Sequence, residues 1–342
     1  MPTVRLSSLL ALLAPAIAHA QWTYVNSGST ASLRGLSLVR GGVAWASGTH
    51  GTVLWSNDGG KTWNANPVPG ADSLDLRSVH ALNDGAGYAA SAGDADKGFA
   101  KIFATGDAGR HWHQQYSTAI KGVFLDAIAF WDVRHGIALS DPVDSAFFLL
   151  TTNDGGRTWT RIPAKNLPRV LAGEAAFAAS GSSLVLNGES EVWIGTGGGG
   201  RARVFHSKDR GATWSVVETP IHAAGQGAGI FSLAFLDAKR GVAVGGDYSK
   251  PSLAATSVAI TQDGGMTWAA AKAPPAAYLS GVAFAGSAAK LVAVGTIGTF
   301  VSSDSGQTWA HSDTLALNAV RFIGTWGVAV GPRGRIAFTE AP

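Results

Sequence analysis

The 342-residue sequence contains no cysteine and few charged residues, and each shortage excludes a class of protein. Without cysteine, the chain can hold no disulfide scaffold, no iron–sulfur cluster and no Cys-based zinc site. Asp, Glu, Lys and Arg make up only 14% of the residues, which is too few for a disordered chain or a heptad coiled coil. The formal net charge of +3 indicates no nucleic-acid footprint, so we expect no nucleic-acid partner.

Long apolar runs are also scarce, and the clearest one lies at the N-terminus, over residues 6–17. Arg5 precedes this run, and residues 18–20 read Ala-His-Ala, the small-x-small pattern that signal peptidase recognises. The run is too short to span a bilayer. We therefore predict that residues 1–20 are a signal peptide and that the mature chain is periplasmic or secreted and not membrane-spanning. A retained membrane anchor is the alternative.

Glycine and tryptophan, in contrast, are abundant, with 45 and 12 residues, and many of them belong to one repeated pattern. The pattern Ser/Thr-x-Asp-x-Gly-x-Thr-Trp occurs six times, with His111 in place of threonine in the second copy. Its aspartates and tryptophans are Asp58, Asp107, Asp154, Asp209, Asp263 and Asp304, and Trp63, Trp112, Trp159, Trp214, Trp268 and Trp309. Successive aspartates are 49, 47, 55, 54 and 41 residues apart, a period typical of propeller blades.

The residue types of the pattern are those of a hairpin turn. Each copy follows a β-like run, such as residues 52–55 or 258–260. Aspartate can accept backbone N–H groups in the turn, and glycine adopts the positive φ that a tight turn requires. Threonine favours the outgoing strand, and tryptophan can bury a large ring between neighbouring blades. We therefore predict a structural role, and no chemical one, for these aspartates and tryptophans.

Strand-like runs between the copies determine the number of blades. Three runs follow the sixth copy, Leu317–Ile323, Trp326–Gly331 and Arg335–Thr339, and they have no such pattern of their own. Residues 22–25 can supply the missing fourth strand. We predict an all-β fold, a seven-bladed β-propeller formed by residues 21–342 as one monomeric domain, in which an N-terminal strand closes the last blade. Such closure removes the open sheet edges that invite aggregation.

The repeated pattern is similar to the Asp-box, also called the BNR repeat. With its seven predicted blades, the chain resembles the BNR-type propellers related to the photosystem II stability/assembly factor of chloroplasts and cyanobacteria. Residues 174–180, 195–198 and 244–248 also resemble those of uncharacterised exported bacterial relatives. The resemblance implies an assembly role with a protein partner. The Asp-box also occurs in sialidases, xyloglucanases and sorting receptors, so it specifies architecture more strongly than activity.

The predicted topology places the candidate binding residues on the rim opposite the Asp-box turns. Loops between the second and third strands, and segments between blades, converge there at the mouth of the channel. We expect the ligand contacts to be exposed side chains of these loops, namely Asp141, Asp144, Glu174, Arg201, Arg203, Asp247 and Tyr248. The alternative is that these loops carry charge only because loops are solvated.

Two functions remain open at this point. The first is a non-enzymatic, exported scaffold that binds a protein or polymer partner through the channel mouth. The second is a glycan-active hydrolase or lyase that uses mouth carboxylates, although no local spacing pairs them as such chemistry requires. We assign no catalytic residue, no metal and no cofactor. The glycine-rich run at residues 195–200 leads into a strand instead of a helix, and His111 and His113 have no third ligand nearby in sequence.

Overall fold

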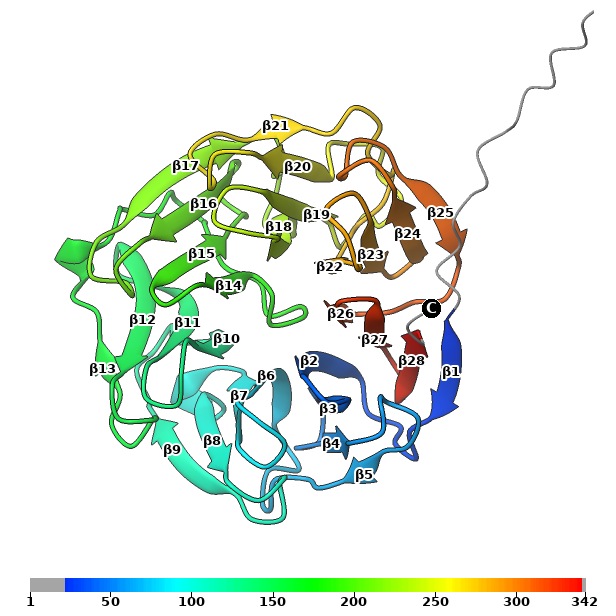
Figure 1. The fold of residues 1–342 in the computed structure, drawn as a ribbon. Helices are drawn as coiled ribbons and strands as arrows, with labels where there is room; N and C mark the ends of the chain where they lie inside the picture. The colour runs from blue at the N-terminus through cyan, green and yellow to red at the C-terminus, as the bar shows by residue number, and fades with distance from the viewer. Residues whose placement is uncertain (1–21, 340–342) are drawn as a thin grey trace, which may run out of the picture.

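Seven four-stranded antiparallel sheets surround a central channel, and six of them contain one copy of the repeated pattern each (Figure 1). The computed structural model describes residues 22–339. The signal peptide expected over residues 1–20 lies outside the described residues. We number the blades along the chain, so that the innermost strand of each blade comes first and the next blade begins after the outermost strand. The predicted seven-bladed propeller is confirmed.

The strands of the first four blades follow the order of the sequence. Blade 1 comprises β2 (Leu33–Val39), β3 (Val43–Gly48), β4 (Val53–Ser56) and β5 (Asn64–Ala65). Blade 2 comprises β6 (Asp75–Ala81), β7 (Gly87–Ala92), β8 (Lys101–Thr105) and β9 (His113–Ser117). Blade 3 comprises β10 (Leu125–Phe130), β11 (Gly136–Val143), β12 (Ala146–Thr152) and β13 (Thr160–Arg161). Blade 4 comprises β14 (Leu184–Asn187), β15 (Glu191–Gly195), β16 (Ala202–Ser207) and β17 (Ser215–Thr219).

The next two blades repeat this order, and two short 3-10 helices lie in the loops. Blade 5 comprises β18 (Ala228–Phe235), β19 (Gly241–Asp247), β20 (Val258–Thr261) and β21 (Ala269–Ala270). Blade 6 comprises β22 (Gly281–Phe284), β23 (Leu291–Gly295), β24 (Gly298–Ser302) and β25 (Ala310–Asp313). The short helices are η1 (Ala95–Lys97) and η2 (Ala164–Asn166). Within residues 22–339, no helix has the length and apolar character needed to cross a membrane.

Blade 7 combines both ends of the described chain. It comprises β26 (Ala319–Ile323), β27 (Trp326–Val330) and β28 (Arg335–Thr339), with β1 (Thr23–Asn26) as its outermost strand. β1 runs antiparallel to β28, with Thr23 opposite Phe338. The Ser27 hydroxyl donates a hydrogen bond of 2.6 Å to the carbonyl of Gly334 just beyond this pair. The predicted closure of the last blade by an N-terminal strand is therefore confirmed.

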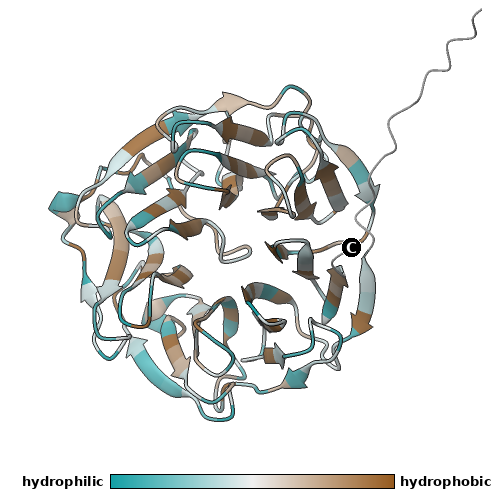
Figure 2. Cartoon of the chain, in the orientation of Figure 1, coloured by the Kyte–Doolittle hydropathy of each residue, from teal (hydrophilic) through white to brown (hydrophobic). Residues whose placement is uncertain are grey.

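The hydrophobic core lies between adjacent blades. The inner strands are predominantly hydrophobic, whereas polar residues gather in the outer strands and loops (Figure 2). Trp45 of blade 1, for example, is fully buried and packs edge-on against Trp112 of blade 2, with ring centroids 6.4 Å apart. Because each blade covers the apolar face of the next, a complete ring covers all of them.

The turns formed by the repeated pattern, which we call Asp-box turns for their resemblance to that motif, join the third and fourth strands of blades 1–6, as predicted. In blade 3, the Asp154 carboxylate accepts hydrogen bonds from the backbone N–H of Thr158 at 2.9 Å and from its hydroxyl at 2.7 Å. These bonds hold the pKa of Asp154 at about 2. In blade 2, the Nδ1 atom of His111 lies 2.6 Å from Asp107 and takes the place of the threonine hydroxyl. Each aspartate is thus occupied in holding its own turn.

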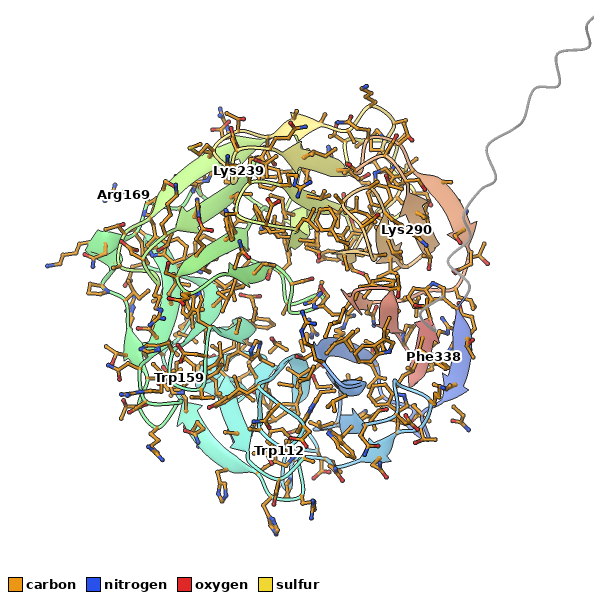
Figure 3. All side chains as sticks on the ribbon, in the orientation of Figure 1. Trp112, Trp159, Arg169, Lys239, Lys290 and Phe338 are labelled. Atoms are coloured by element: carbon orange, nitrogen blue, oxygen red, sulfur yellow. The ribbon has the colours of Figure 1, made fainter. Side chains whose placement is uncertain are left out.

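The tryptophans of the turns are half-buried. Trp112 and Trp159 lie toward the outer part of the ring (Figure 3). Trp159 packs edge-on against Phe130 at 5.8 Å between ring centroids, within a cluster that also contains Tyr88 of the preceding blade. The predicted position between neighbouring blades is therefore confirmed for Trp159.

Candidate binding site at the channel mouth

Four of the inner strands contain a β-bulge near their start. In blades 1, 2, 3 and 5, one residue near the start of the inner strand bulges out of the pairing with the second strand. These residues are Arg34, Arg77, Asp126 and Phe231. A β-bulge changes the direction of a side chain and is common next to binding sites. The bulges thus introduce two arginines, one acid and one aromatic ring at the start of four inner strands.

Both of these arginines line a cavity of about 430 Å³ on the rim opposite the Asp-box turns. Its walls include loops between second and third strands, as Thr296 and Tyr248 show. We call this the mouth cavity, and its principal lining residues are Arg34, Arg77, Phe177, Phe231, Tyr248 and Tyr278. Sequence reasoning placed the site at this rim but missed five of these six residues, because it considered only polar residues of the loops.

Aromatic rings form one wall of the mouth cavity. Phe177 stacks on Phe231 with ring centroids 4.0 Å apart, and Tyr278 packs edge-on against Phe231 at 4.7 Å. Tyr248 lies 6.3 Å from Phe231 and is 57% exposed. Stacked and edge-on rings at these distances hold one another in place. The wall is therefore a preformed apolar surface, and Tyr248, predicted from the sequence, is part of it.

The arginines give the mouth cavity an excess of positive charge. The Nε atom of Arg77 donates a hydrogen bond of 2.7 Å to Asp75. Arg34 donates only to the carbonyl of Ala179, at 3.5 Å, and no carboxylate of residues 22–339 lies within ion-pair distance of it. Burial, followed by the positive charge of Arg77, lowers the pKa of Arg34. A guanidinium with free donors at a partly enclosed site is suited to bind a carboxylate.

A segment of blade 4 forms the floor of this cavity. Residues 175–183, which we call the crossing segment, precede β14, and a loop next to β14 reaches into the centre of the ring (Figure 1). Ser180 donates a hydrogen bond of 2.7 Å to the carbonyl of Ser280 in blade 6. Gly181 has φ +67°, and a Cβ atom there would lie 2.9 Å from the hydroxyl of Ser78 in blade 2. Glycine is therefore required where the segment meets the opposite side of the channel.

The base of the crossing segment is anchored by a buried ion pair. Glu174, immediately before the segment, pairs with Arg203 of β16, and both side chains are almost fully buried. Glu174 also accepts hydrogen bonds from the Thr196 hydroxyl at 2.7 Å and from the N–H of Leu171 at 2.8 Å. We expected Glu174 and Arg203 to be exposed, and that expectation was wrong. Both can be buried because their opposite charges neutralise each other at the start of the crossing segment.

Asp141 also holds the crossing segment, at Ala176 near its start. Its carboxylate accepts a hydrogen bond of 3.0 Å from the backbone N–H of Ala176, and burial raises the pKa of Asp141 to about 6. Asp126 is buried beside it, and burial followed by the charge of Asp141 raises the pKa of Asp126 well above its ordinary value, with Arg77 opposing the shift. Sequence reasoning missed Asp126, although its place in the repeated start of the inner strands could have indicated it.

The remaining predicted residues lie in different surroundings. Asp247 is buried, contrary to expectation, because its carboxylate accepts hydrogen bonds from the N–H and hydroxyl of Ser249 at 2.9 and 2.6 Å. Arg201 is exposed and pairs with Glu218 on the outermost strand of blade 4. Asp144 is exposed at the turn between β11 and β12, with φ 66°. Neither Arg201 nor Asp144 lines the mouth cavity.

Metal-ligating side chains are dispersed over the part of the chain that the structure describes. Among residues 22–339, no three His, Asp or Glu residues lie together as a metal site requires. The larger side chains that line the mouth cavity carry guanidinium and aromatic groups. The cavity can hold a carboxylate at Arg34 and an apolar group against the accessible rings of Phe177 and Tyr248.

Stability is expected to fall as the pH rises through the titration range of Asp141. Because its pKa is raised to about 6, the folded protein binds more protons than the unfolded chain between about pH 4 and pH 6. Protonated Asp141 therefore contributes its full share of the free energy of unfolding below about pH 4. This share, on the order of 1–3 kcal/mol, is lost by about pH 6. Asp141→Asn should flatten this loss in urea unfolding measured at several pH values, whereas Asp144→Asn should not. Equal pH dependence in the Asp141→Asn variant and the parent would contradict this assignment.

Comparisons with known proteins identify the fold. Three solved structures are similar over nearly the whole chain. YCF48 bound to D1 peptide matches with a TM-score of 0.66 and 15% identity, covering 98% of this chain and 100% of that one. YCF48 from Cyanidioschyzon merolae matches with a TM-score of 0.66 and 15% identity, covering 94% of this chain and 99% of that one. The Cps50 (Swd1) propeller domain of Myceliophteria thermophila matches with a TM-score of 0.63 and 12% identity, covering 94% of this chain and 99% of that one.

These likenesses confirm the expected resemblance to the photosystem II assembly factor at the level of the fold. No family model matches the sequence, and no curated protein matches it.

Proposed function

We propose that the protein is an exported, non-enzymatic scaffold that binds a short segment of a protein partner in the mouth cavity. The bound segment carries an acidic side chain next to an apolar one. The observation that carries the proposal is the placement of Arg34, without a carboxylate partner, beside the stacked rings of Phe177 and Phe231. Recognition of a polypeptide requires such an apolar anchor with a polar group that sets its orientation.

The cavity has the size and chemistry for this task. About 430 Å³ lies within the usual range of ligand sites and accommodates a few side chains of an extended segment. The guanidinium of Arg34 can pair with a carboxylate through two parallel hydrogen bonds. Phe177 stacks on the buried ring of Phe231, and together with the exposed Tyr248 it presents an apolar surface that needs no rearrangement.

The structural relatives and the N-terminus support the other parts of the proposal. YCF48, a propeller of the same fold, has been solved bound to a D1 peptide, so this architecture is able to bind a polypeptide segment. The basic residue, apolar run and Ala-His-Ala sequence of residues 1–20 support export. A polymer other than protein remains the alternative partner.

The glycan-hydrolase alternative has less support. Such an enzyme needs two carboxyl groups that face the substrate. Among the described residues, those that line the mouth cavity include no carboxyl group. Of the predicted acids, Glu174 is occupied by Arg203 and Asp247 by Ser249. The geometry therefore favours binding over hydrolysis.

The proposal is tested with fluorescent synthetic decapeptides that alternate Glu with Leu or Phe, and with matched peptides that carry Lys in place of Glu. Fluorescence anisotropy should show saturable binding of the acidic peptides only. Arg34→Ala should weaken this binding about tenfold or more, because it removes charged hydrogen bonds. Arg110→Ala, an exposed arginine of an Asp-box turn on the opposite face, is the matched control and should leave binding unchanged.

Melting temperatures of both variants show whether a loss of binding reflects a loss of folding. Binding that does not distinguish Glu from Lys peptides, or that falls equally in Arg34→Ala and Arg110→Ala, would place the site elsewhere.

A further inference from the structure

A second cavity, of about 490 Å³, lies in the channel on the other side of the crossing segment. Gly181 of that segment lines this lower cavity, whereas Phe177 to Ala179 line the mouth cavity, so the segment lies between the two. Asn187 and Gly188, at the turn between β14 and β15, also line it. That turn is on the face of the Asp-box turns, so the lower cavity opens on the face opposite the mouth.

One position of every inner strand faces the lower cavity. Each such residue pairs with the second strand of its own blade at the same level, as Ser37 does with Trp45 and Arg321 does with Val328. In blades 3–6 these residues are small or apolar: Ala129, Val185, Ala234 and Ala283. In blades 7, 1 and 2, which are neighbours in the ring, they are Arg321, Ser37 and His80. At this level of the wall, the polar side chains therefore occupy one sector of the ring.

Arg321 has no counter-charge in this wall. Its guanidinium donates a hydrogen bond of 3.1 Å to the carbonyl of the adjacent Val320, and no carboxylate of residues 22–339 lies within ion-pair distance of it. Burial lowers the pKa of Arg321 to about 10, so the group stays charged at neutral pH. An enclosed charge without a partner is costly, and an anion that enters the cavity removes that cost.

The other polar groups of the sector can assist an anion. The Ser37 oxygen accepts the N–H of Ala81 at 3.0 Å, so its own hydroxyl hydrogen is available to donate. Burial, followed by the charge of Arg321, lowers the pKa of His80 to about 4. The imidazole is therefore neutral at neutral pH and has one N–H to donate. The sector thus offers a single positive charge with two neutral donors, which matches a monoanion.

The remaining wall is suited to an apolar body. Phe130, Phe235, Phe284 and Phe322 line the cavity next to the alanines. We propose that the lower cavity binds a small apolar monocarboxylate, whose carboxylate pairs with Arg321 and whose alkyl chain lies against the phenylalanines and alanines. This site is separate from the mouth cavity and does not depend on the function proposed for it.

The test uses octanoate as the probe and octan-1-ol as its uncharged counterpart, with the full mature chain at pH 7.5 below the micellar range. Isothermal titration calorimetry should show saturable binding of octanoate and at least tenfold weaker binding of octanol. Arg321→Met, which keeps an unbranched apolar side chain but lacks the guanidinium, should weaken octanoate binding at least tenfold and should not lower the melting temperature, because it removes an unpaired charge. Arg110→Ala should bind octanoate as the parent does.

The outcomes separate this proposal from the function of the mouth. Octanoate should not displace the acidic decapeptide, because the two cavities lie on opposite sides of the crossing segment. Equal affinity for octanol and octanoate in the parent protein, or no saturable binding of either, overturns the proposal even if Arg321→Met fails to fold. Displacement of octanoate by a peptide with an apolar C-terminal residue would instead assign the cavity to a polypeptide terminus and also overturn it.

Discussion

Deleting residues 22–28 is expected to lower the melting temperature by roughly 5–10 °C, because the deletion removes the strand that closes the ring. β1 pairs with β28 along its whole length, and Val25 packs in the same cluster as Phe338. Without β1, the edge of β28 is exposed and blade 7 loses its outermost strand. Differential scanning calorimetry of the deleted chain and of the parent chain measures the effect directly.

The control for this deletion is a chain in which residues 22–28 are scrambled but retained. It keeps the length and composition of the N-terminus but loses the alternation that places Val25 in the core. We expect the scrambled chain to melt close to the deleted one. If both chains melted at the temperature of the parent, closure of blade 7 by β1 would contribute nothing to stability.

Arg203→Ala is expected to destabilise the protein by roughly 3–5 kcal/mol, because Glu174 would be left as a buried charge without its partner. The measurement is the free energy of unfolding from urea titration at neutral pH. Arg201→Ala is the matched control, two residues away in an exposed pair with Glu218. Exposed pairs contribute little, so this variant should lose less than about 1 kcal/mol.

The double variant Glu174→Gln/Arg203→Ala should recover part of the stability that Arg203→Ala loses, since it has the same side chain at position 203 but no unpaired charge. An Arg203→Ala variant as stable as Arg201→Ala would show that the buried pair does not anchor the crossing segment. Recovery in the double variant would distinguish the cost of a lone charge from the loss of side-chain volume.

The fold was predictable because its signals are local and repeated. Each Asp-box turn is determined by residues within eight positions of one another, as Thr152 to Trp159 illustrate. The seventh blade needed only the count of three further strands and one strand at the N-terminus. Hydrogen bonds such as those of Asp154 with Thr158 then follow from residue types that favour the same turn each time.

The mouth cavity was only partly predictable because its residues are brought together by bulges and long-range pairing. Arg34 and Arg77 belong to inner strands, where the pattern of the sequence predicts core residues, and only the β-bulges direct them to the channel. Glu174 and Arg203 lie 29 residues apart, and no sequence spacing shows that they neutralise each other. Tyr248 was predicted because it lies in a loop between a second and a third strand.

The crossing segment could not be predicted from the sequence at all. Residues 175–183 look like an ordinary connection between blades, rich in alanine and serine. Their path across the channel depends on contacts with distant blades, such as Ser180 with Ser280 and Gly181 with Ser78. These contacts form only when the ring is complete, so local propensity carries no signal for them.

The central claim, that the mouth cavity is the binding site, is tested most directly by amide hydrogen–deuterium exchange with and without the acidic decapeptide. The account predicts slower exchange over residues 175–183 and around Tyr248 and Tyr278 when the peptide is bound, with no change at the Asp-box turns. Slower exchange confined to the Asp-box turns, with the crossing segment unaffected, would contradict it.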